Sequence, residues 1–269
     1  MSGLIDLIAE ALVRVRVKRP LVHHITNFVV MNDCANITLH IGGSPVMAHD
    51  REEVEEMVSL ADSLLLNIGT LSGDRIDSMV LAGRCANKKA IPVLLDPVGA
   101  GATVMRSQAA KRLLREVKIS FIKGNAGEIS VLAGEDAAVR GVDFAETSGD
   151  LAKVACRLAK EYNCTVIITG AVDWVSDGQS TYSVQNGHKL MSALTGTGCM
   201  AGSLVAAFAG AVEDPMLAAL SGLTCFGIAA ELAAKREQNP ASFKTALFDE
   251  VYALNSEKIK MLARFERVS

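Results

Sequence analysis

Aromatic residues are scarce in this chain. Phe, Tyr and Trp make up 4% of its 269 residues, although half of the chain is hydrophobic. The apolar residues must therefore be mostly aliphatic, and a chain of this length can bury about three quarters of its unfolded surface. This apolar fraction, together with only six prolines, excludes a disordered chain. A single-domain α/β protein over 1–269 is the simplest expectation.

An excess of charge of one sign is also missing. The 27 basic and 30 acidic residues give a formal net charge of −3. A basic patch for nucleic acid would leave a strongly positive balance, and so would a polybasic membrane surface. We therefore expect no nucleic-acid partner and no electrostatic attachment to a membrane.

Closely spaced cysteines are absent. The six cysteines are scattered, no C-x-x-C occurs, and no His stands at metal-ligand spacing from any of them. This excludes a zinc finger and a disulfide framework, and it is typical of a reducing compartment. The N-terminal segment 1–20 has charges within its apolar stretch, which predicts an amphipathic helix and not a secretory signal. We therefore expect a cytoplasmic protein.

Two long uncharged runs, 190–212 and 215–230, raise the alternative of a membrane hairpin. A spanning helix needs about 20 apolar residues. Gly196 and Gly198 interrupt the first run, so its helix can begin only near Cys199, which leaves about 14 residues before Glu213. We therefore favour buried helices of a protein core and no membrane insertion.

The middle of the chain alternates between short apolar runs and longer stretches of helical period. The runs 64–66, 91–95, 119–122 and 166–168 predict buried strands, and 51–61, 74–86, 107–117 and 150–162 predict helices. Such alternation predicts a mostly parallel central sheet with helices on both faces, a three-layer α/β fold. Segment 171–190 predicts antiparallel edge hairpins with turns at 177–178 and 186–187. From Cys199 onward the chain is expected to be helical to its end.

Polar residues follow the predicted strands, where open α/β sheets bind their ligands. Asn67, Asp96, Lys123 and Thr169 each come after one strand, beside a glycine. Asp96 and Glu128 supply the carboxylate oxygens that Mg²⁺ prefers, and Lys123 can neutralise a phosphate. For Glu128 an alternative stays open, because a carboxylate also stabilises the first turn of a helix that opens near Asn125. We expect these strand ends to share one crevice that handles phosphate.

The strongest local motif is the TGTGC sequence at 195–199, which leads into a helix. Glycines there let the backbone turn tightly, and the N–H groups of Gly196, Thr197 and Gly198 at a helix N-terminus predict an anion hole. No Gly-Lys-Ser/Thr follows, so it is not a Walker loop. Gly196, Gly198 and Ala201 match a dinucleotide-binding pattern, but no strand is expected after them. An oxidoreductase is therefore the weaker alternative.

Cys199 closes this motif at the expected start of the helix, where a thiolate is favoured. A catalytic thiol is one interpretation. The other is a small residue packed where a larger one would block the helix end. Spacing alone does not separate them.

Six segments in fixed order resemble the hydroxyethylthiazole kinase family, the thiamin-salvage branch of the ribokinase-like superfamily. They are HITN at 24–27, GGSPVMA at 42–48, LNIGTL at 66–71, DPVGAGAT at 96–103, KGNAGE at 123–128 and TGTGC at 195–199. The resemblance implies a ribokinase-like fold, a homotrimer, and ATP- and Mg²⁺-dependent phosphorylation of the primary alcohol of 4-methyl-5-(2-hydroxyethyl)thiazole. The alternatives are a hydroxymethylpyrimidine kinase and a non-catalytic thiazole- or thiamin-binding sensor.

The resemblance also implies residue roles. Cys199, which stands where most of the superfamily has an Asp base, would orient the substrate hydroxyl or accept its proton. The binding residues it implies are Met47, Gly196 and Asn27 for the thiazole, Lys123, Thr169 and Asn125 for ATP, and Asp96 and Glu128 for the metal. One position departs from the family pattern, since Lys123 stands where Arg is common, and Lys offers a point charge instead of a bidentate fork.

Overall fold

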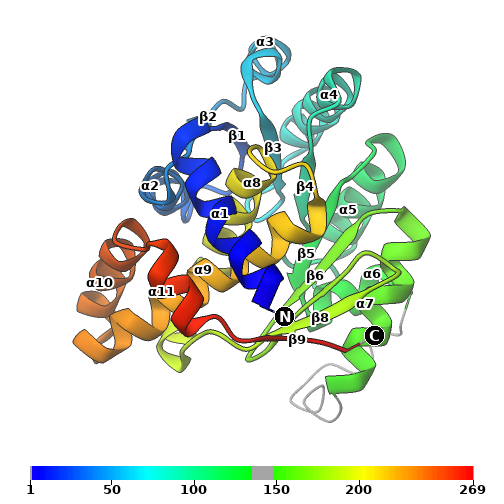
Figure 1. Ribbon diagram of the computed structural model, residues 1–269. Helices are drawn as coiled ribbons and strands as arrows, with labels where there is room; N and C mark the ends of the chain where they lie inside the picture. Colours follow the sequence, from blue (N-terminus) through cyan, green and yellow to red (C-terminus); the bar gives the residue numbers. More distant parts are fainter. Residues whose placement is uncertain (1, 135–147, 269) are drawn as a thin grey trace.

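A single mixed β-sheet organises the computed structural model, which describes residues 2–134 and 148–268 (Figure 1). Within these residues nine strands follow the order β2-β1-β3-β4-β5-β6-β7-β8-β9, in which β1 to β6 are parallel and β7 to β9 antiparallel. The strands are β1 (Leu21–Ile25), β2 (Ser44–Met47), β3 (Ser63–Asn67), β4 (Val93–Asp96), β5 (Phe121–Asn125), β6 (Thr165–Thr169), β7 (Asp173–Ser176), β8 (Thr181–Val184) and β9 (Phe265–Arg267).

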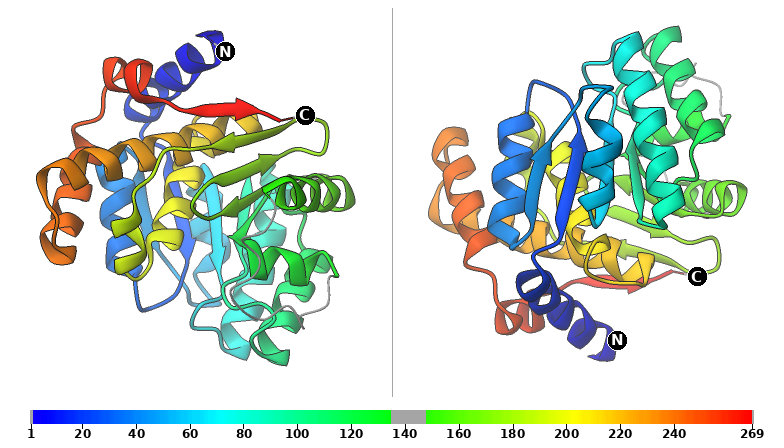
Figure 2. Two further views of the ribbon diagram at one scale, coloured as in Figure 1. Left: turned by 90° about the horizontal axis from the view of Figure 1, so that it is seen from below. Right: turned by 90° about the horizontal axis from the view of Figure 1, so that it is seen from above.

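Helices cover both faces of the sheet, as the two views in Figure 2 show. One face carries α1 (Ser2–Lys18), α2 (Met31–Ile41), α8 (Thr197–Ala209) and α9 (Pro215–Arg236), with α10 (Pro240–Tyr252) and α11 (Ser256–Leu262) packed on them. The other face carries α3 (Val54–Leu60), α4 (Gly73–Lys89), α5 (Val104–Glu116), α6 (Ala126–Leu132) and α7 (Ser148–Tyr162). The expected three-layer α/β architecture is confirmed.

Successive residues of a strand pack alternately into two hydrophobic cores, one on each face of the sheet. In β3, Leu65 packs into the core under α8, whereas Leu64 and Leu66 pack into the core under α4. In β6, Ile167 faces the first core and its two neighbours face the second. This follows from the two-residue period of a strand, so a strand buried on both faces has to be apolar throughout. The continuous apolar runs in the sequence therefore predicted the right strands.

Two strands have no clear sequence signal. The strand β1 contains two adjacent histidines, and β2 is four residues long and contains a proline. Both break the apolar run that marks a buried strand. They extend the parallel part of the sheet beyond the strands that the sequence predicted.

The end of the sheet differs from the expected pair of hairpins. The turn at Asp177–Gly178 joins β7 to β8 as predicted. The predicted hairpin turn at Asn186–Gly187 is wrong, because the chain runs on into the short 3-10 helix η2 (Lys189–Ala193). The free edge of β8 instead pairs with β9, so the prediction of a helical end is wrong for the last residues described. The strand β9 follows four helices and has only three residues, too few to show the alternating pattern of a strand in the sequence.

The long uncharged runs form buried helices, as expected. The helix α9 is long and apolar enough to cross a membrane by length and composition, but 83% of its most apolar window is buried inside the fold. It packs against α8 and α10. Core helices of folded proteins meet the same length and composition criteria, and the burial explains why α9 carries so few charges.

Gly222 of α9 lies where α9 closely approaches α8. A Cβ there would lie 2.9 Å from the Cα of Val205 in α8. Overpacking of this kind costs about 1–3 kcal/mol, so Gly222→Ala is expected to lower the free energy of unfolding in urea despite the better helix propensity of Ala. Gly73→Ala is the matched control, because nothing lies within 4 Å of a Cβ at the start of α4. Equal stability of the two variants would contradict the described packing of α8 on α9.

Candidate active site

A buried ion pair lies at the carboxyl ends of the central strands. Asn67 and Asp96 are paired residues at the ends of β3 and β4. Asp96 Oδ2 accepts a hydrogen bond from Asn67 Nδ2 at 2.9 Å and one from Lys123 Nζ at 3.3 Å. All three residues are almost completely buried. The structure thus brings the polar strand ends together as the sequence analysis expected.

Lys123 lies inside β5 and does not follow it, because the strand runs on to Asn125. Two residues earlier, Phe121 packs into the core under α8, and the two-residue period points Lys123 to the same side. Burial alone would lower the pKa of Lys123. The negative charge of Asp96, with smaller contributions from Cys199 and Glu128, outweighs burial and leaves the pKa above its usual value. The site therefore holds a fixed cation.

The TGTGC segment forms the first turn of α8 directly above this cation. Gly196 caps the helix with φ +83, a left-handed conformation that favours glycine, and a Cβ there would collide with Val30. A Cβ at Gly198 would lie 3.3 Å from Lys123 Nζ. The first N–H groups of a helix have no partner within it, and this is the arrangement that the predicted anion hole at Gly196, Thr197 and Gly198 requires.

Cys199 belongs to an amide network that links this turn to β1 and β3. Its Sγ accepts hydrogen bonds from Asn67 Nδ2 at 3.3 Å and from Asn27 Nδ2 at 3.4 Å. Asn27 Nδ2 also donates to Asn67 Oδ1 at 2.9 Å. Asn67 therefore touches Asp96, Asn27 and Cys199 at once. The sequence analysis placed Asn67 among the polar strand ends but gave it no role.

The surroundings of Cys199 oppose the thiolate that a helix start by itself favours. Burial raises the pKa of its thiol, and the nearby negative charge of Asp96 raises it further. Lys123 and the two amide donors lower it by less. With its pKa above the ordinary value, the thiol is protonated near neutral pH.

Glu128 stabilises the start of α6, the alternative that the sequence left open. Its Oε2 accepts from the backbone N–H of Asn125, whose side chain accepts in turn from the N–H of Glu128, and the two form a capping box. Its Oε1 accepts from the N–H of Gly99 at 2.8 Å. Glu128 therefore fastens the loop after β4 to the end of β5 and stays near the Asp96–Lys123 pair.

The sites expected for the thiazole lie at the same edge of the sheet. Met47 is the last residue of β2 and stands beside His24 of β1. Asn27 follows β1 by two residues. Both residues are therefore near the carboxyl ends of the strands. Asn27 is hydrogen-bonded to Cys199, and within the described residues the structure shows no such bond for Met47.

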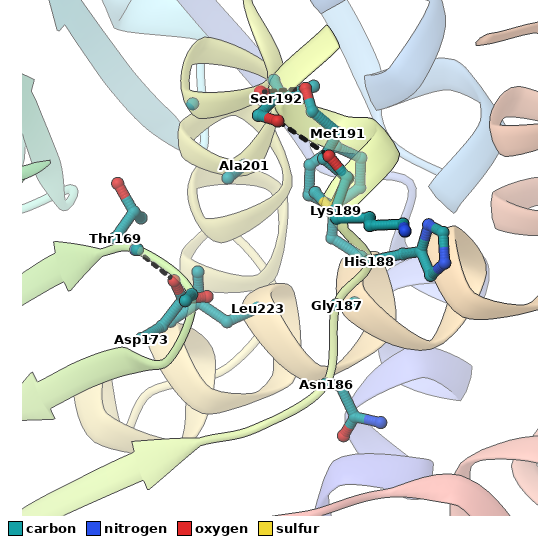
Figure 3. Close-up of a pocket in the computed structure, with 16 residues that line it drawn as sticks. Thr169, Asp173, Asn186, Gly187, His188, Lys189, Met191, Ser192, Ala201 and Leu223 are labelled. Atoms are coloured by element: carbon teal, nitrogen blue, oxygen red, sulfur yellow. Dashed lines mark hydrogen bonds between the residues drawn. The ribbon is translucent and has the colours of Figure 1, made fainter. Parts of the chain in front are cut away.

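A pocket of about 540 Å³ adjoins the turn at 196–198 (the anion turn), on the side away from Cys199. Figure 3 shows its walls: the turn after β6, the segment after β8, η2, and the inward faces of α8 and α9. Thr197 and Gly198 line it, as does Thr169, but Cys199 does not. The anion turn therefore stands between this pocket and the Cys199 network.

Asp173 is a pocket residue that the sequence analysis missed. Its Oδ1 accepts from the N–H of Gly170 at 2.9 Å, and burial raises its pKa to about 7. An isolated Asp in a predicted edge hairpin gives no sequence signal, since most such residues are turn or solvent-facing carboxylates.

A divalent cation fits the oxygen atoms present. Asp96 Oδ1 is buried without a hydrogen-bond partner in the structure, and a carboxylate oxygen is a preferred Mg²⁺ ligand. No group of three His, Cys, Asp or Glu side chains that could hold a metal occurs within residues 2–134 and 148–268. Mg²⁺ commonly needs only one or two protein carboxylates, because waters and substrate phosphates complete its coordination.

Comparisons with known proteins agree with this geometry. A family model described as the hydroxyethylthiazole kinase family matches residues 12–257. Two relatives named hydroxyethylthiazole kinase come from Roseiflexus sp. (strain RS-1), 54% identical over 98% of both chains, and Chloroflexus aggregans, 52% identical over 96% of this chain and 93% of the relative.

Solved structures extend the agreement to the fold. The hydroxyethylthiazole kinase protein from Pyrococcus horikoshii OT3 superposes with a TM-score of 0.91 at 46% identity, covering 97% of this chain and 99% of that one. Pyridoxal kinase from Staphylococcus aureus in complex with AMP-PCP and pyridoxal has a TM-score of 0.58 at 15% identity, covering 78% and 86%. The second likeness concerns the fold alone, and the expected ribokinase-like fold is confirmed. The chain belongs to the hydroxyethylthiazole kinase family.

Proposed function

We propose that this protein transfers the terminal phosphoryl group of ATP to the hydroxyl of 4-methyl-5-(2-hydroxyethyl)thiazole, in thiamin biosynthesis or salvage. One observation carries the proposal: the first turn of α8 separates a pocket of nucleotide size from the Cys199 network and has the Lys123 cation beneath it. A phosphoryl group held at that turn is within reach of ligands on both sides. Family membership supports the alcohol as acceptor.

In this proposal the nucleotide occupies the pocket, with Thr169 at its wall and its terminal phosphate at Gly196, Thr197 and Gly198. Backbone N–H groups and Lys123 stabilise the charge that spreads over the phosphoryl oxygens during transfer. Positioning and charge stabilisation provide most of the rate in phosphoryl transfer. Asn125, at the start of α6, completes the proposed ATP contacts.

The thiazole is proposed to bind on the other side of the turn, against Met47, Asn27 and Gly196. Asn27 and Asn67 hold the Cys199 thiol in place through its sulfur. A protonated thiol orients the substrate hydroxyl by hydrogen bonding and cannot accept its proton; that proton is lost late and passes to an oxygen of the transferred phosphoryl group. This assigns Cys199 mainly to positioning.

Mg²⁺ is proposed to bind at Asp96, through the carboxylate oxygen that lacks a partner, and near Glu128 through water. When bound, the ion neutralises phosphate charge. Asp96 is also the partner of Lys123, so the same carboxylate fixes the cation under the anion turn. Lys123, which replaces the common Arg, acts as a point charge in this arrangement.

We further propose a single cytoplasmic domain that assembles as a homotrimer. Phe28 and Val29, directly after Asn27, are 64% and 68% exposed. Large exposed apolar side chains beside a binding residue support an interface between subunits there. Neither nucleic acid nor a membrane is a proposed partner.

The substrate is tested by ADP release with Mg²⁺ and ATP. We expect release that depends on the thiazole alcohol and little with the pyrimidine alcohol, because the family model and the relatives are named for the thiazole. No thiazole-dependent ADP would contradict the proposal and favour a binding protein without kinase activity. Pyrimidine-dependent ADP alone would favour the other kinase.

The role of Cys199 is tested by substitution. Cys199→Asp is expected to keep or raise kcat, because a carboxylate is the better proton acceptor. Cys199→Ala is expected to lower kcat roughly tenfold, less than the 10²- to 10⁴-fold typical of general bases, because the proton leaves late. If Cys199→Ala equals the wild type, the thiol is there only for packing.

The raised thiol pKa gives a pH dependence. Iodoacetamide reacts with thiolate, so labelling of Cys199 in the nucleotide-free protein should be slow at pH 7 and rise to half its maximum only above the ordinary thiol range of about 8.5. Asp96→Asn removes a negative charge and should move that midpoint to lower pH. Cys85, on α4, serves as the internal reference in the peptide analysis. A midpoint below pH 8 in the wild type would contradict the described electrostatics.

A further inference from the structure

One wall of the pocket is a segment without regular structure. Residues 185–188 connect β8 to η2, and Asn186, Gly187 and His188 line the pocket (Figure 3). One backbone hydrogen bond ties it to a distant segment, from the N–H of Gln185 to the carbonyl of Arg264 at 2.9 Å. The other polar groups of the segment need partners from elsewhere.

Glu231 of α9 holds this segment. Its Oε1 accepts a hydrogen bond from the backbone N–H of Gly187 at 2.9 Å and one from Asn186 Nδ2 at 3.0 Å. Both carboxylate oxygens also pair with Arg264, Oε1 at 2.7 Å and Oε2 at 3.0 Å. Glu231 itself does not line the pocket.

Residues 262–264, just before β9, also contact the wall segment. Arg264 precedes β9, and its backbone N–H donates to Asn186 Oδ1 at 2.7 Å. Asn186 Nδ2 also donates to the carbonyl of Leu262 at 2.9 Å. Residues 262–264 therefore hold the side chain of Asn186 through two hydrogen bonds.

Gly227 explains how closely the wall approaches α9. It lies one helical turn before Glu231, on the same face. A Cβ at Gly227 would overlap the backbone carbonyl of Asn186. Gly227 thus lets the segment lie directly on the helix, and Glu231 fastens it there.

Glu231 is stabilised in its ionised, carboxylate form. Burial alone would raise its pKa, but the hydrogen bonds from Arg264, Gly187 and Asn186 together leave the pKa below its usual value. The side chain is 16% exposed. Charge-assisted hydrogen bonds of this kind are among the stronger polar contacts in proteins.

We propose that Glu231 is a positioning residue for the nucleotide: it fixes the 186–188 wall on α9, and Arg264 holds its carboxylate in place. This rests on the proposed function, in which ATP occupies this pocket. Glu231 touches no substrate, and its effect passes through Asn186 and Gly187. It should therefore act on nucleotide affinity and leave the thiazole side unchanged.

The first experiment compares Glu231→Ala with Glu231→Gln. The Ala variant removes all acceptors, and we expect the KM for ATP and the directly titrated Kd for ADP to rise about tenfold, with the thiazole KM within about twofold of wild type. The Gln variant keeps one oxygen for Asn186 and Gly187 but loses the charge and the second oxygen that accepts from Arg264. Its ATP KM should stay within about threefold of wild type.

Glu250→Ala is the matched control. Glu250 of α10 accepts from Arg236 at 2.8 Å and from Lys258 at 3.1 Å, with its side chain 10% exposed, and it does not line the pocket. Its loss should lower the Tm comparably without changing the KM for ATP. A general loss of stability would affect both variants alike, so the ATP KM separates positioning from structure.

Three results would overturn the inference: an unchanged ADP Kd in Glu231→Ala, an equal rise in both KM values, or the same ATP effect in Glu250→Ala. If Glu231→Ala does not fold, Arg264→Ala decides, since its side chain is half exposed and it keeps the bonds from Glu231 to the wall. Its ADP Kd should rise about threefold, and no change would count against the proposal. A wild type that binds ADP but releases none with thiazole would contradict the kinase function while leaving this test valid.

Discussion

The ion pair between Asp96 and Lys123 is the constraint on which the site depends. Two charges this deeply buried are costly unless each is paired and hydrogen-bonded, and removal of one partner leaves the other uncompensated. Asn67 supplies an additional bond to Asp96. The pair therefore fixes a cation under α8. Burial raises the pKa of the neighbouring Cys199 thiol, and the Asp96 carboxylate raises it further, whereas Lys123 lowers it. The charges that face the start of α8 and the thiol thus come from the same pair.

Much of this was predictable because buried parallel strands are apolar throughout and their polar ends are conspicuous. Asp96, Lys123 and Thr169 stood out as polar residues after apolar runs, and the structure places all three at one edge of the sheet. The motif at 195–199 predicted a helix start with a special backbone, and Gly196 has the positive φ that such a start requires.

What the sequence could not show depends on contacts between distant segments. The ionisation of Cys199 is one case: its position in the helix favours a thiolate, but its burial and the charge of Asp96, about a hundred residues earlier, decide the opposite. The role of Asn67 is another, since an Asn after a strand is unremarkable until it is known that its side chain contacts Asn27, Asp96 and Cys199. The strand β9 was missed because three residues carry no period.

The return of the chain end to β8 has a consequence beyond pairing a free strand edge. It delivers Arg264 to Glu231 and its own backbone N–H to Asn186, in the segment that lines the pocket. The two ligand sides of the anion turn are therefore built differently. The Cys199 side is held by a network buried at the strand ends, whereas the pocket side is held by Glu231, which is 16% exposed, and by Arg264, which is half exposed. The pocket wall therefore depends on a contact between α9 and the segment before β9, which forms only because the chain returns to β8.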